Sequence, residues 1–194
     1  MTPIRQTVER AFAAHRTAFE ASLSDAGIAD IELGGKLLSE AANTGHKMLV
    51  CGNGGSSSDA AHLAGEWTGR YKEDRIPLPA VALGSNLASL TAIGNDYGYE
   101  DVFAREVHAL GNEDDVLVAI TTSGSSKNVI KAIAAARERK MKIIVLTGKK
   151  GAHLRGNVDC VVAVDSEETA RIQEFHEFVY HVWCEHVDAN LTRP

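Results

Sequence analysis

The sequence predicts an α/β fold, a three-layer αβα sandwich around a five-stranded parallel sheet, preceded by two helices. From residue 47 onward, short apolar runs alternate with helical segments, a rhythm typical of a parallel sheet that helices cover on both faces. Two of these runs lead through loops rich in glycine or hydroxyl side chains directly into helices. Because 194 residues suffice to bury one large core, we expect a single domain spanning residues 1–194.

The first 45 residues are predicted to form a pair of helices, over residues 3–24 and 28–43. The first begins at Thr2-Pro3 and carries apolar side chains at helical spacing, namely Ile4, Val8, Phe12, Phe19 and Leu23. A small sandwich need not cover that stripe, so we expect it to contact another subunit. In the second helix, Gly34-Gly35 costs roughly 1 kcal/mol per glycine relative to alanine, which weakens the helix or marks a close packing point.

The α/β core is predicted to occupy residues 46–194. Its strands are expected over residues 47–51, 80–83, 116–121, 142–146 and 160–164. Its helices are expected from about residue 57, and over residues 87–110, 128–139 and 169–191.

Composition narrows the class of protein. The net charge of -6 argues against a nucleic-acid partner, which usually calls for a basic stripe. The start of the chain lacks the apolar segment of a secretory signal, and no run reaches 18 apolar residues, so we expect a cytoplasmic protein without a membrane span. Cys51, Cys160 and Cys184 form no C-x-x-C pair, which indicates reduced core thiols.

The first glycine-rich loop, Cys51-Gly52-Asn53-Gly54-Gly55-Ser56, is predicted to bind an anion. Its glycines let the backbone approach a ligand, and the helix that follows offers unpaired N–H groups. A dinucleotide site would need a further glycine at position 57 and an acid after the second strand, where Leu83-Gly84-Ser85-Asn86 has none. A nucleotide P-loop would need G-K-[ST], which is absent from this loop.

The loop after the third strand repeats this design with hydroxyl groups. Thr121-Thr122-Ser123-Gly124-Ser125-Ser126 places five hydroxyl side chains in six positions before a helix, and these can surround phosphate oxygens with neutral donors. A simple helix N-cap would need only one of them. Because both loops lie at carboxyl ends of parallel strands, we expect them to converge on one crevice, with the second loop as the phosphate cradle.

Two helices carry candidate metal ligands or acid/base groups. His62 and Glu66 stand four residues apart, and Gln173, Glu177 and His181 follow an i, i+4, i+8 row. Imidazole and carboxylate are suitable zinc ligands, and a glutamine carbonyl is a rarer one. Each group alone is more typical of a solvated surface pair than of a ligand set, and the spacing does not establish that the two helices meet.

Taken together, these segments resemble the sedoheptulose 7-phosphate isomerase (phosphoheptose isomerase) family of sugar isomerase (SIS) domains, over most of residues 47–186. The resemblance is carried by the first loop, by Asp59-x-x-His62-x-x-x-Glu66 with Thr68-Gly69-Arg70-Tyr71, by residues 91–98, by Thr122-Ser123-Gly124, and by Arg171-Ile172-Gln173-Glu174 with His181. It implies a homotetramer with active sites at subunit interfaces. It also implies one zinc ion per subunit, bound by His62, Glu66, Gln173 and His181.

The resemblance further implies which residues contact the phosphosugar: Asn53, Gly54, Gly55, Ser56, Asp59, Glu66, Arg70, Asn95, Asp96, Thr121, Thr122, Ser123, Ser126 and Gln173. The implied reaction converts sedoheptulose 7-phosphate to D-glycero-D-manno-heptose 7-phosphate through an enediol, the first step of ADP-heptose or GDP-heptose biosynthesis. Glu66 would be the base and His181 the acid, and zinc would polarise the oxygens. A carboxylate that binds a metal ion is a weaker base, so the implied roles of Glu66 as zinc ligand and as base conflict.

Two departures from the family and three alternatives stay open. Thr121 stands where serine is commoner, which preserves the hydroxyl, and Ala170 stands where some members carry an aspartate linked to activity; Glu168 is near it in sequence. The chain could be a non-catalytic SIS regulator that binds a replication initiator protein, although Glu66 and His181 are both present. It could also isomerise another phosphosugar, or work without zinc.

Overall fold

The computed structural model describes residues 2–192 and confirms the predicted five-stranded, all-parallel sheet. The strands are β1 (Met48–Gly52), β2 (Ala80–Ala82), β3 (Val116–Thr121), β4 (Lys142–Gly148) and β5 (Cys160–Val164), in the order β2-β1-β3-β4-β5. In the register, Val50 of β1 lies between Ala82 of β2 and Val118 of β3. The first strand of the sequence is therefore an inner strand of the sheet.

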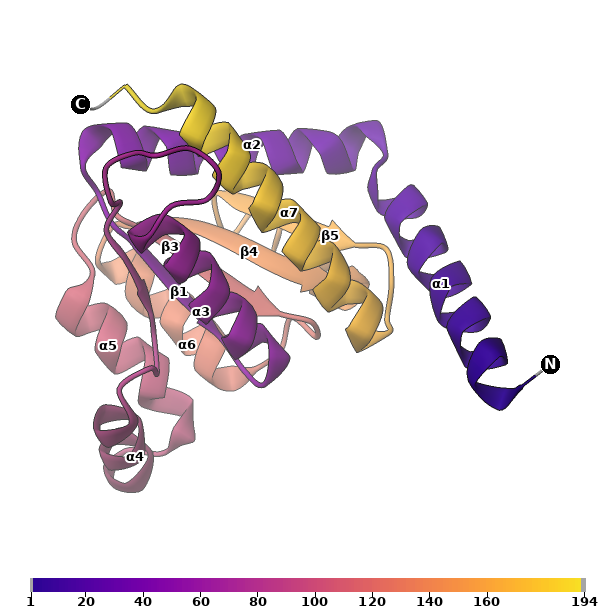
Figure 1. Ribbon diagram of the computed structural model, residues 1–194. Coiled ribbons are helices and arrows are strands. Elements are labelled where there is room, and N and C mark those ends of the chain that lie inside the picture. The colour runs from indigo at the N-terminus through magenta and orange to yellow at the C-terminus, as the bar shows by residue number, and fades with distance from the viewer. Residues whose placement is uncertain (1, 193–194) are drawn as a thin grey trace.

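Helices cover both faces of this sheet (Figure 1). One face packs against α2 (Asp25–Thr44), α3 (Gly55–Thr68) and α7 (Thr169–Asn190), and the other against α5 (Val102–Leu110) and α6 (Lys127–Glu138). Neighbouring strand residues alternate between the two cores: Met48 and Val50 face α2, α3 and α7, whereas Leu49 and Cys51 face α5 and α6. This double burial explains the unbroken apolar runs of the inner strands.

One predicted element was wrong: residues 87–110 do not form one helical stretch. They divide into α4 (Leu87–Asp96), a 3-10 turn (Tyr99–Asp101) and α5. The break falls at Gly98, whose φ of 97° is incompatible with a right-handed helix. The structure also adds a second 3-10 segment, Lys149–Leu154, starts α3 at Gly55 and extends β4 to Gly148.

The glycine pair in α2 is a close packing point. A Cβ atom built at Gly34 would lie 2.5 Å from the Trp183 ring of α7, and one at Gly35 would lie 3.2 Å from it. Trp183 is 1% exposed and donates its indole N–H to the carbonyl of Ile31 at 2.8 Å. The two glycines thus allow α7 to lie directly against α2, which offsets their low helix propensity.

Helix α1 (Pro3–Ser22) projects from one side of the body (Figure 1). Its second half is anchored, because Phe19 packs edge-on against Phe175 and Phe178 of α7. Its first half leaves Ile4, Val8 and Phe12 between 59% and 70% exposed. The predicted apolar stripe is therefore uncovered within one chain.

The remaining features of the fold concern its thiols and its helix lengths. Cys51, Cys160 and Cys184 are free and buried, as predicted. Within residues 2–192, no helix combines the length and the apolar character needed to cross a bilayer.

We expect Gly34→Ala to destabilise the fold by about 1–3 kcal/mol, because the added methyl group collides with the buried indole ring of Trp183. Urea unfolding measures the effect. Gly65→Ala in α3 is the matched control, since nothing lies within 4 Å of its built Cβ. It should be neutral or stabilise by roughly 0.5–1 kcal/mol. Equal effects of the two substitutions would contradict the packing argument.

Candidate functional site

The site is built where β1 and β3 lie side by side. The helices that follow these two strands, α3 and α6, cover opposite faces of the sheet. The carboxyl ends of these two strands are the position where open α/β sheets bind ligands. The two predicted loops meet there, because the side-chain amides of Asn53 and Asn128 exchange hydrogen bonds of 2.9 and 2.8 Å.

The first loop has a shape that only glycines permit. Gly54 has φ 57° and ψ -123° and lies at the start of α3. A Cβ atom at Gly52 would lie 2.5 Å from the carbonyl oxygen of Ser56, and one at Gly55 would lie 2.4 Å from Nε2 of Gln173. The Gln173 side chain, which α7 supplies, therefore rests directly on this loop.

The second loop, Thr121 to Ser126, is held by its own hydroxyl groups. The Thr121 hydroxyl donates to Ser126 at 3.3 Å and accepts the Gly124 N–H at 3.2 Å, while Ser123 accepts from both the backbone and the side chain of Ser125. Gly124 has φ 70°, and a Cβ built there would lie 2.3 Å from the Cα of Gly151. The loop is thus fixed before any ligand binds.

His62 and His181 come together between α3 and α7. Their ring centroids lie 5.1 Å apart, edge to face. His62 Nε2 lies 3.2 Å from Glu66 Oε1, and its Nδ1 lies 3.0 Å from the Tyr180 hydroxyl. On its other side, the His181 ring stacks on Tyr71 with centroids 5.5 Å apart. The predicted pair on α3 is therefore joined to the predicted acid on α7.

Glu177 is a member of this cluster that the sequence analysis placed in the helical row but left without a role. One ligand atom from each of His62, Glu177 and His181 lies within 4.8 Å of the others, and Glu177 Oε1 is 3.8 Å from His62 Nδ1. Its spacing of four residues from both Gln173 and His181 was the available signal. The carboxylate count at the site is therefore one higher than the sequence indicated.

Asp59 lies on α3 beside the same group. Burial and, to a lesser degree, the Glu177 carboxylate raise the pKa of Asp59 to about 6, although His62 acts in the opposite direction. The buried Oδ2 atom of Asp59 has no hydrogen-bond partner in the described structure. An acceptor or donor of a bound ligand could complete it.

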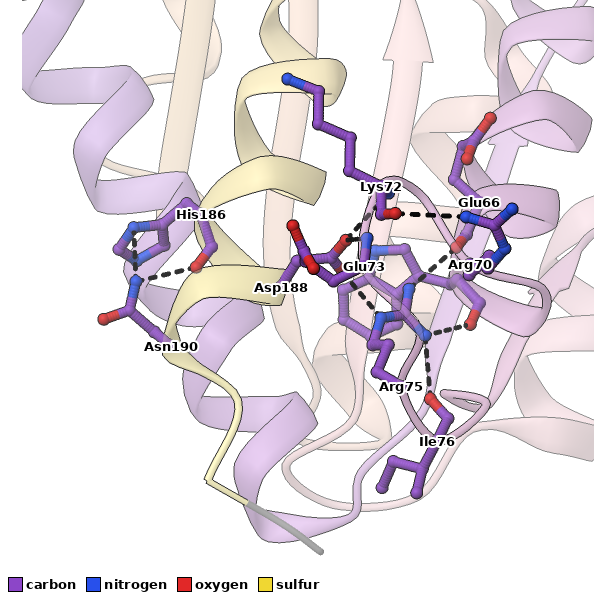
Figure 2. A network of polar contacts seen from close by, with 10 residues as sticks. Glu66, Arg70, Lys72, Glu73, Arg75, Ile76, His186, Asp188 and Asn190 are labelled. Carbon is purple, nitrogen blue, oxygen red and sulfur yellow. Dashed lines mark hydrogen bonds and ion pairs between the residues drawn. The ribbon is translucent and has the colours of Figure 1, made fainter.

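The end of α3 is tied to α7 by a buried ion pair (Figure 2). Arg75 Nε lies 2.6 Å from Asp188 Oδ1, and these side chains are 7% and 3% exposed. The same guanidinium donates to the backbone carbonyls of Glu66 and Trp67 at 2.9 and 3.1 Å. Although burial raises the pKa of Asp188, hydrogen bonds from Arg75 and from two backbone N–H groups outweigh it, and that pKa is lowered. Arg75 thereby positions the backbone of Glu66.

Arg70, Asn95 and Asp96 of the implied substrate set make no hydrogen bond, ion pair or ring contact with either loop or with the His62 cluster in the described part of the chain. Arg70 is exposed and donates to the carbonyl of Lys72 at 3.1 Å (Figure 2). Asn95 and Asp96 hydrogen-bond to each other at the exposed end of α4, a helix with no buried residue.

The donors fit a zinc ion. Imidazole nitrogens and carboxylate oxygens are the ligands that zinc prefers, and two ligand atoms about 2.0–2.1 Å from a tetrahedral ion stand roughly 3.3 Å apart. The His62 Nε2 to Glu66 Oε1 distance is 3.2 Å. A second group of possible ligands, His62, Glu177 and His181, has ligand atoms within 4.8 Å of one another, with Glu177 on the Nδ1 side of His62 and Glu66 on the Nε2 side.

The chain matches known proteins along nearly its whole length. The profile of the SIS domain matches residues 11–148. The phosphoheptose isomerase of Helicobacter pylori strain 26695 is 45% identical over 189 residues, which cover 97% of this chain and 98% of that protein. The phosphoheptose isomerase of Campylobacter concisus is 43% identical and covers 95% of this chain and 97% of its own length.

Solved structures give the same result. The phosphoheptose isomerase of Neisseria gonorrhoeae superimposes with a TM-score of 0.89 at 40% identity, covering 96% of this chain and 99% of that one. The phosphoheptose isomerase of Francisella tularensis gives a TM-score of 0.90 at 37% identity, covering 97% and 100%.

We expect Asp188→Ala to destabilise the protein by about 3–5 kcal/mol near pH 7, because it leaves the Arg75 guanidinium buried without a counter-charge. The difference from wild type should shrink as the pH falls below about 4, since a carboxylate with a lowered pKa stabilises above its unfolded pKa and loses that effect on protonation. Glu185→Gln, which breaks the exposed pair with Lys72, should change stability by less than about 1 kcal/mol. Chemical unfolding at several pH values distinguishes the two.

Proposed function

We propose that this chain, which belongs to the phosphoheptose isomerase family of SIS-domain proteins, converts sedoheptulose 7-phosphate to D-glycero-D-manno-heptose 7-phosphate, the first step of ADP-heptose or GDP-heptose biosynthesis. It is an aldose-ketose isomerase. The observation that carries the proposal is the double contact of the first loop, with the start of α6 through Asn53 and Asn128 and with Gln173 of α7, the helix that also carries His181.

The two loops bind different parts of the substrate. The hydroxyl-rich loop, with the start of α6 behind it, is the cradle for the phosphate. The first loop lines the sugar, and Gln173 reaches it across Gly55. Binding energy from the phosphate, which does not react, can thereby fix the reacting carbons next to the acid/base groups.

The chemistry moves one proton between neighbouring carbons. Glu66 takes the proton from C1 of the ketose while the C2 carbonyl oxygen gains one, which gives the cis-enediol. Returning a proton to C2 and removing one from the C1 hydroxyl then gives the aldose. His181, whose ring contacts Tyr71 and Tyr180, transfers protons to and from the substrate oxygens. Positioned groups of this kind contribute about 10² to 10⁴ in rate each.

Zinc belongs to the proposal as the cofactor, one ion per subunit. His62, Glu66, Gln173 and His181 would hold it, and Glu177 is near enough to share that task. When bound, zinc polarises the substrate's oxygens as a Lewis acid. If Glu177 supplies the carboxylate ligand, Glu66 keeps its basicity, which removes the tension between the two roles of Glu66.

We also propose that the active form is a cytoplasmic homotetramer. The first half of α1 exposes Ile4, Val8 and Phe12, and an apolar groove of about 410 Å³ lies at the other end of the helix, lined by Leu23, Ile28, Phe178 and Val182 among others. Contiguous exposed apolar surface is typical of an interface. Arg70, Asn95 and Asp96 are exposed away from the cluster, so a second subunit would be needed to bring such residues to a shared active site.

Turnover tests the proposal directly. We expect purified protein to convert sedoheptulose 7-phosphate to the aldoheptose when followed by NMR, faster with added zinc than after treatment with a chelator. Binding without turnover under both conditions would instead favour a non-catalytic regulator. Faster turnover of another phosphosugar would move the substrate assignment, and equal rates with and without metal would remove zinc from the mechanism.

Glu66→Gln should lower kcat by at least about 10²-fold while sedoheptulose 7-phosphate still raises the melting temperature, because the phosphate loop is intact. Glu177→Gln is the comparison variant. If Glu66 is the base and Glu177 a ligand, Glu66→Gln keeps its zinc and Glu177→Gln loses part of it, as metal analysis would show. Wild-type turnover by Glu66→Gln would eliminate Glu66 as the base.

A further inference from the structure

Asn53 and Asn128 form a reciprocal pair of side-chain amides where the two loops meet. Asn53 Nδ2 donates to Asn128 Oδ1 at 2.9 Å, and Asn128 Nδ2 donates to Asn53 Oδ1 at 2.8 Å. Asn128 is 4% exposed and lies in the first turn of α6. The proposed reaction assigns this buried side chain no task.

A single backbone group fixes the direction of every hydrogen bond in this pair. The N–H of Val129 lies 3.0 Å from Oδ1 of Asn128. A backbone N–H can only donate, so the atom it faces must be the amide oxygen of Asn128 and not its nitrogen. The Asn53 atom that faces this oxygen must then be the nitrogen, and the Asn53 oxygen must face the nitrogen of Asn128.

Tyr99 completes the chain. Its hydroxyl lies 3.0 Å from Oδ1 of Asn53. Since that oxygen only accepts, the Tyr99 hydroxyl donates. The 3-10 turn that carries Tyr99 is itself tied to α6, because Glu100 pairs with Lys127 at 2.8 Å and Asp101 with Lys131 at 2.9 Å. The first loop, the 3-10 turn and α6 therefore meet at Asn53, whose side-chain oxygen accepts one hydrogen bond from each of the other two segments.

The consequence concerns what Asn53 can offer a ligand. Its oxygen has two acceptor positions, and both are used, by Asn128 and by Tyr99. Its nitrogen has two protons, and among the described residues only Asn128 accepts one of them. The hydrogen-bonding group that Asn53 has left for a ligand is therefore an N–H donor. A freely rotating asparagine would offer either an oxygen or a nitrogen, and would have to be ordered on binding.

We propose that Asn128 and Tyr99 are positioning residues that lock the Asn53 amide so that it presents only an N–H to an oxygen of the phosphosugar. This inference rests on the proposed function. It adds that the glycine-rich loop recognises its substrate through the side-chain N–H of Asn53. The orientation of that amide is fixed before binding, because the backbone N–H of Val129 in α6 orients Asn128.

A double-mutant cycle tests the lock. Asn128→Asp keeps the shape of the side chain but sets an acceptor oxygen against the Asn53 oxygen, and should lower kcat/KM by about 10- to 100-fold. In an Asn53→Ala background, the same change should alter kcat/KM by less than about twofold, because Asn128 acts through Asn53. Melting temperatures of all four proteins ensure that folded enzymes are compared.

Tyr99→Phe gives a second cycle that does not disturb a buried group, since Tyr99 is 60% exposed. It should lower kcat/KM by about 3- to 10-fold, and again only when Asn53 is present. Tyr97→Phe is the matched control. Tyr97 is 57% exposed, and its hydroxyl has no hydrogen bond in the described structure, so kcat/KM should stay within about twofold of wild type.

Effects of equal size with and without the Asn53 side chain would overturn the proposal, as would full activity of Asn53→Ala.

A readout without substrate separates this failure from failure of the proposed function. The side-chain amide signals of Asn53 in ¹⁵N–¹H spectra, identified by their loss in Asn53→Ala, should shift in Asn128→Asp and Tyr99→Phe but not in Tyr97→Phe. Unchanged signals in both variants would contradict the lock even if the wild-type enzyme turned over no sedoheptulose 7-phosphate.

Discussion

The constraint on which the rest of the structure depends is the adjacency of β1 and β3 with their following helices on opposite faces of the sheet. Parallel strands place their carboxyl ends at the same edge, and α3 and α6 lead away from that edge over opposite faces of the sheet. The glycine loop and the hydroxyl loop each follow one of these strands. Neither loop would be a binding site alone, because a phosphosugar needs one surface for its phosphate and another for its reacting carbons.

Helix α7 is the second requirement, because it supplies the groups that α3 lacks. It lies against α2 through the contact of Trp183 with Gly34 and Gly35, and it is tied to the end of α3 through Arg75 and Asp188. With those two attachments fixed, the helical period alone sets Gln173, Glu177 and His181 on the side that faces α3. The position of the His62, Glu177 and His181 cluster thus depends on how the C-terminal half of α7 packs.

The polar groups of the crevice are mostly neutral and fixed before a ligand arrives. The hydroxyls of Thr121 and Ser123 hold their own loop, and the Asn53 and Asn128 amides hold each other. Preorganised donors of this kind need little reorganisation when a charged ligand binds, whereas long cationic side chains must be ordered at an entropic cost. A protein with a net charge of -6 can therefore bind a sugar phosphate without a basic surface.

The sequence by itself determined the features that depend on local period and local chemistry. The fold class, the five strands, the two loops, and the four-residue spacing of His62 and Glu66 all follow from residues near one another in the chain. Even the one error, the unbroken helix over residues 87–110, arose because a single positive φ at Gly98 outweighed a favourable apolar pattern.

Only the tertiary structure decided which distant residues share a site. The entry of Glu177 into the histidine cluster, the positioning of Glu66 by Arg75 and Asp188, and the chain from Val129 through Asn128 to Asn53 and Tyr99 join segments that lie far apart in sequence. No spacing rule predicts them, because helix and strand periods fix the face on which a side chain lies and not the partner that it meets. For the same reason the contributions of Arg70, Asn95 and Asp96 stay predictions, since one chain does not bring them to the crevice.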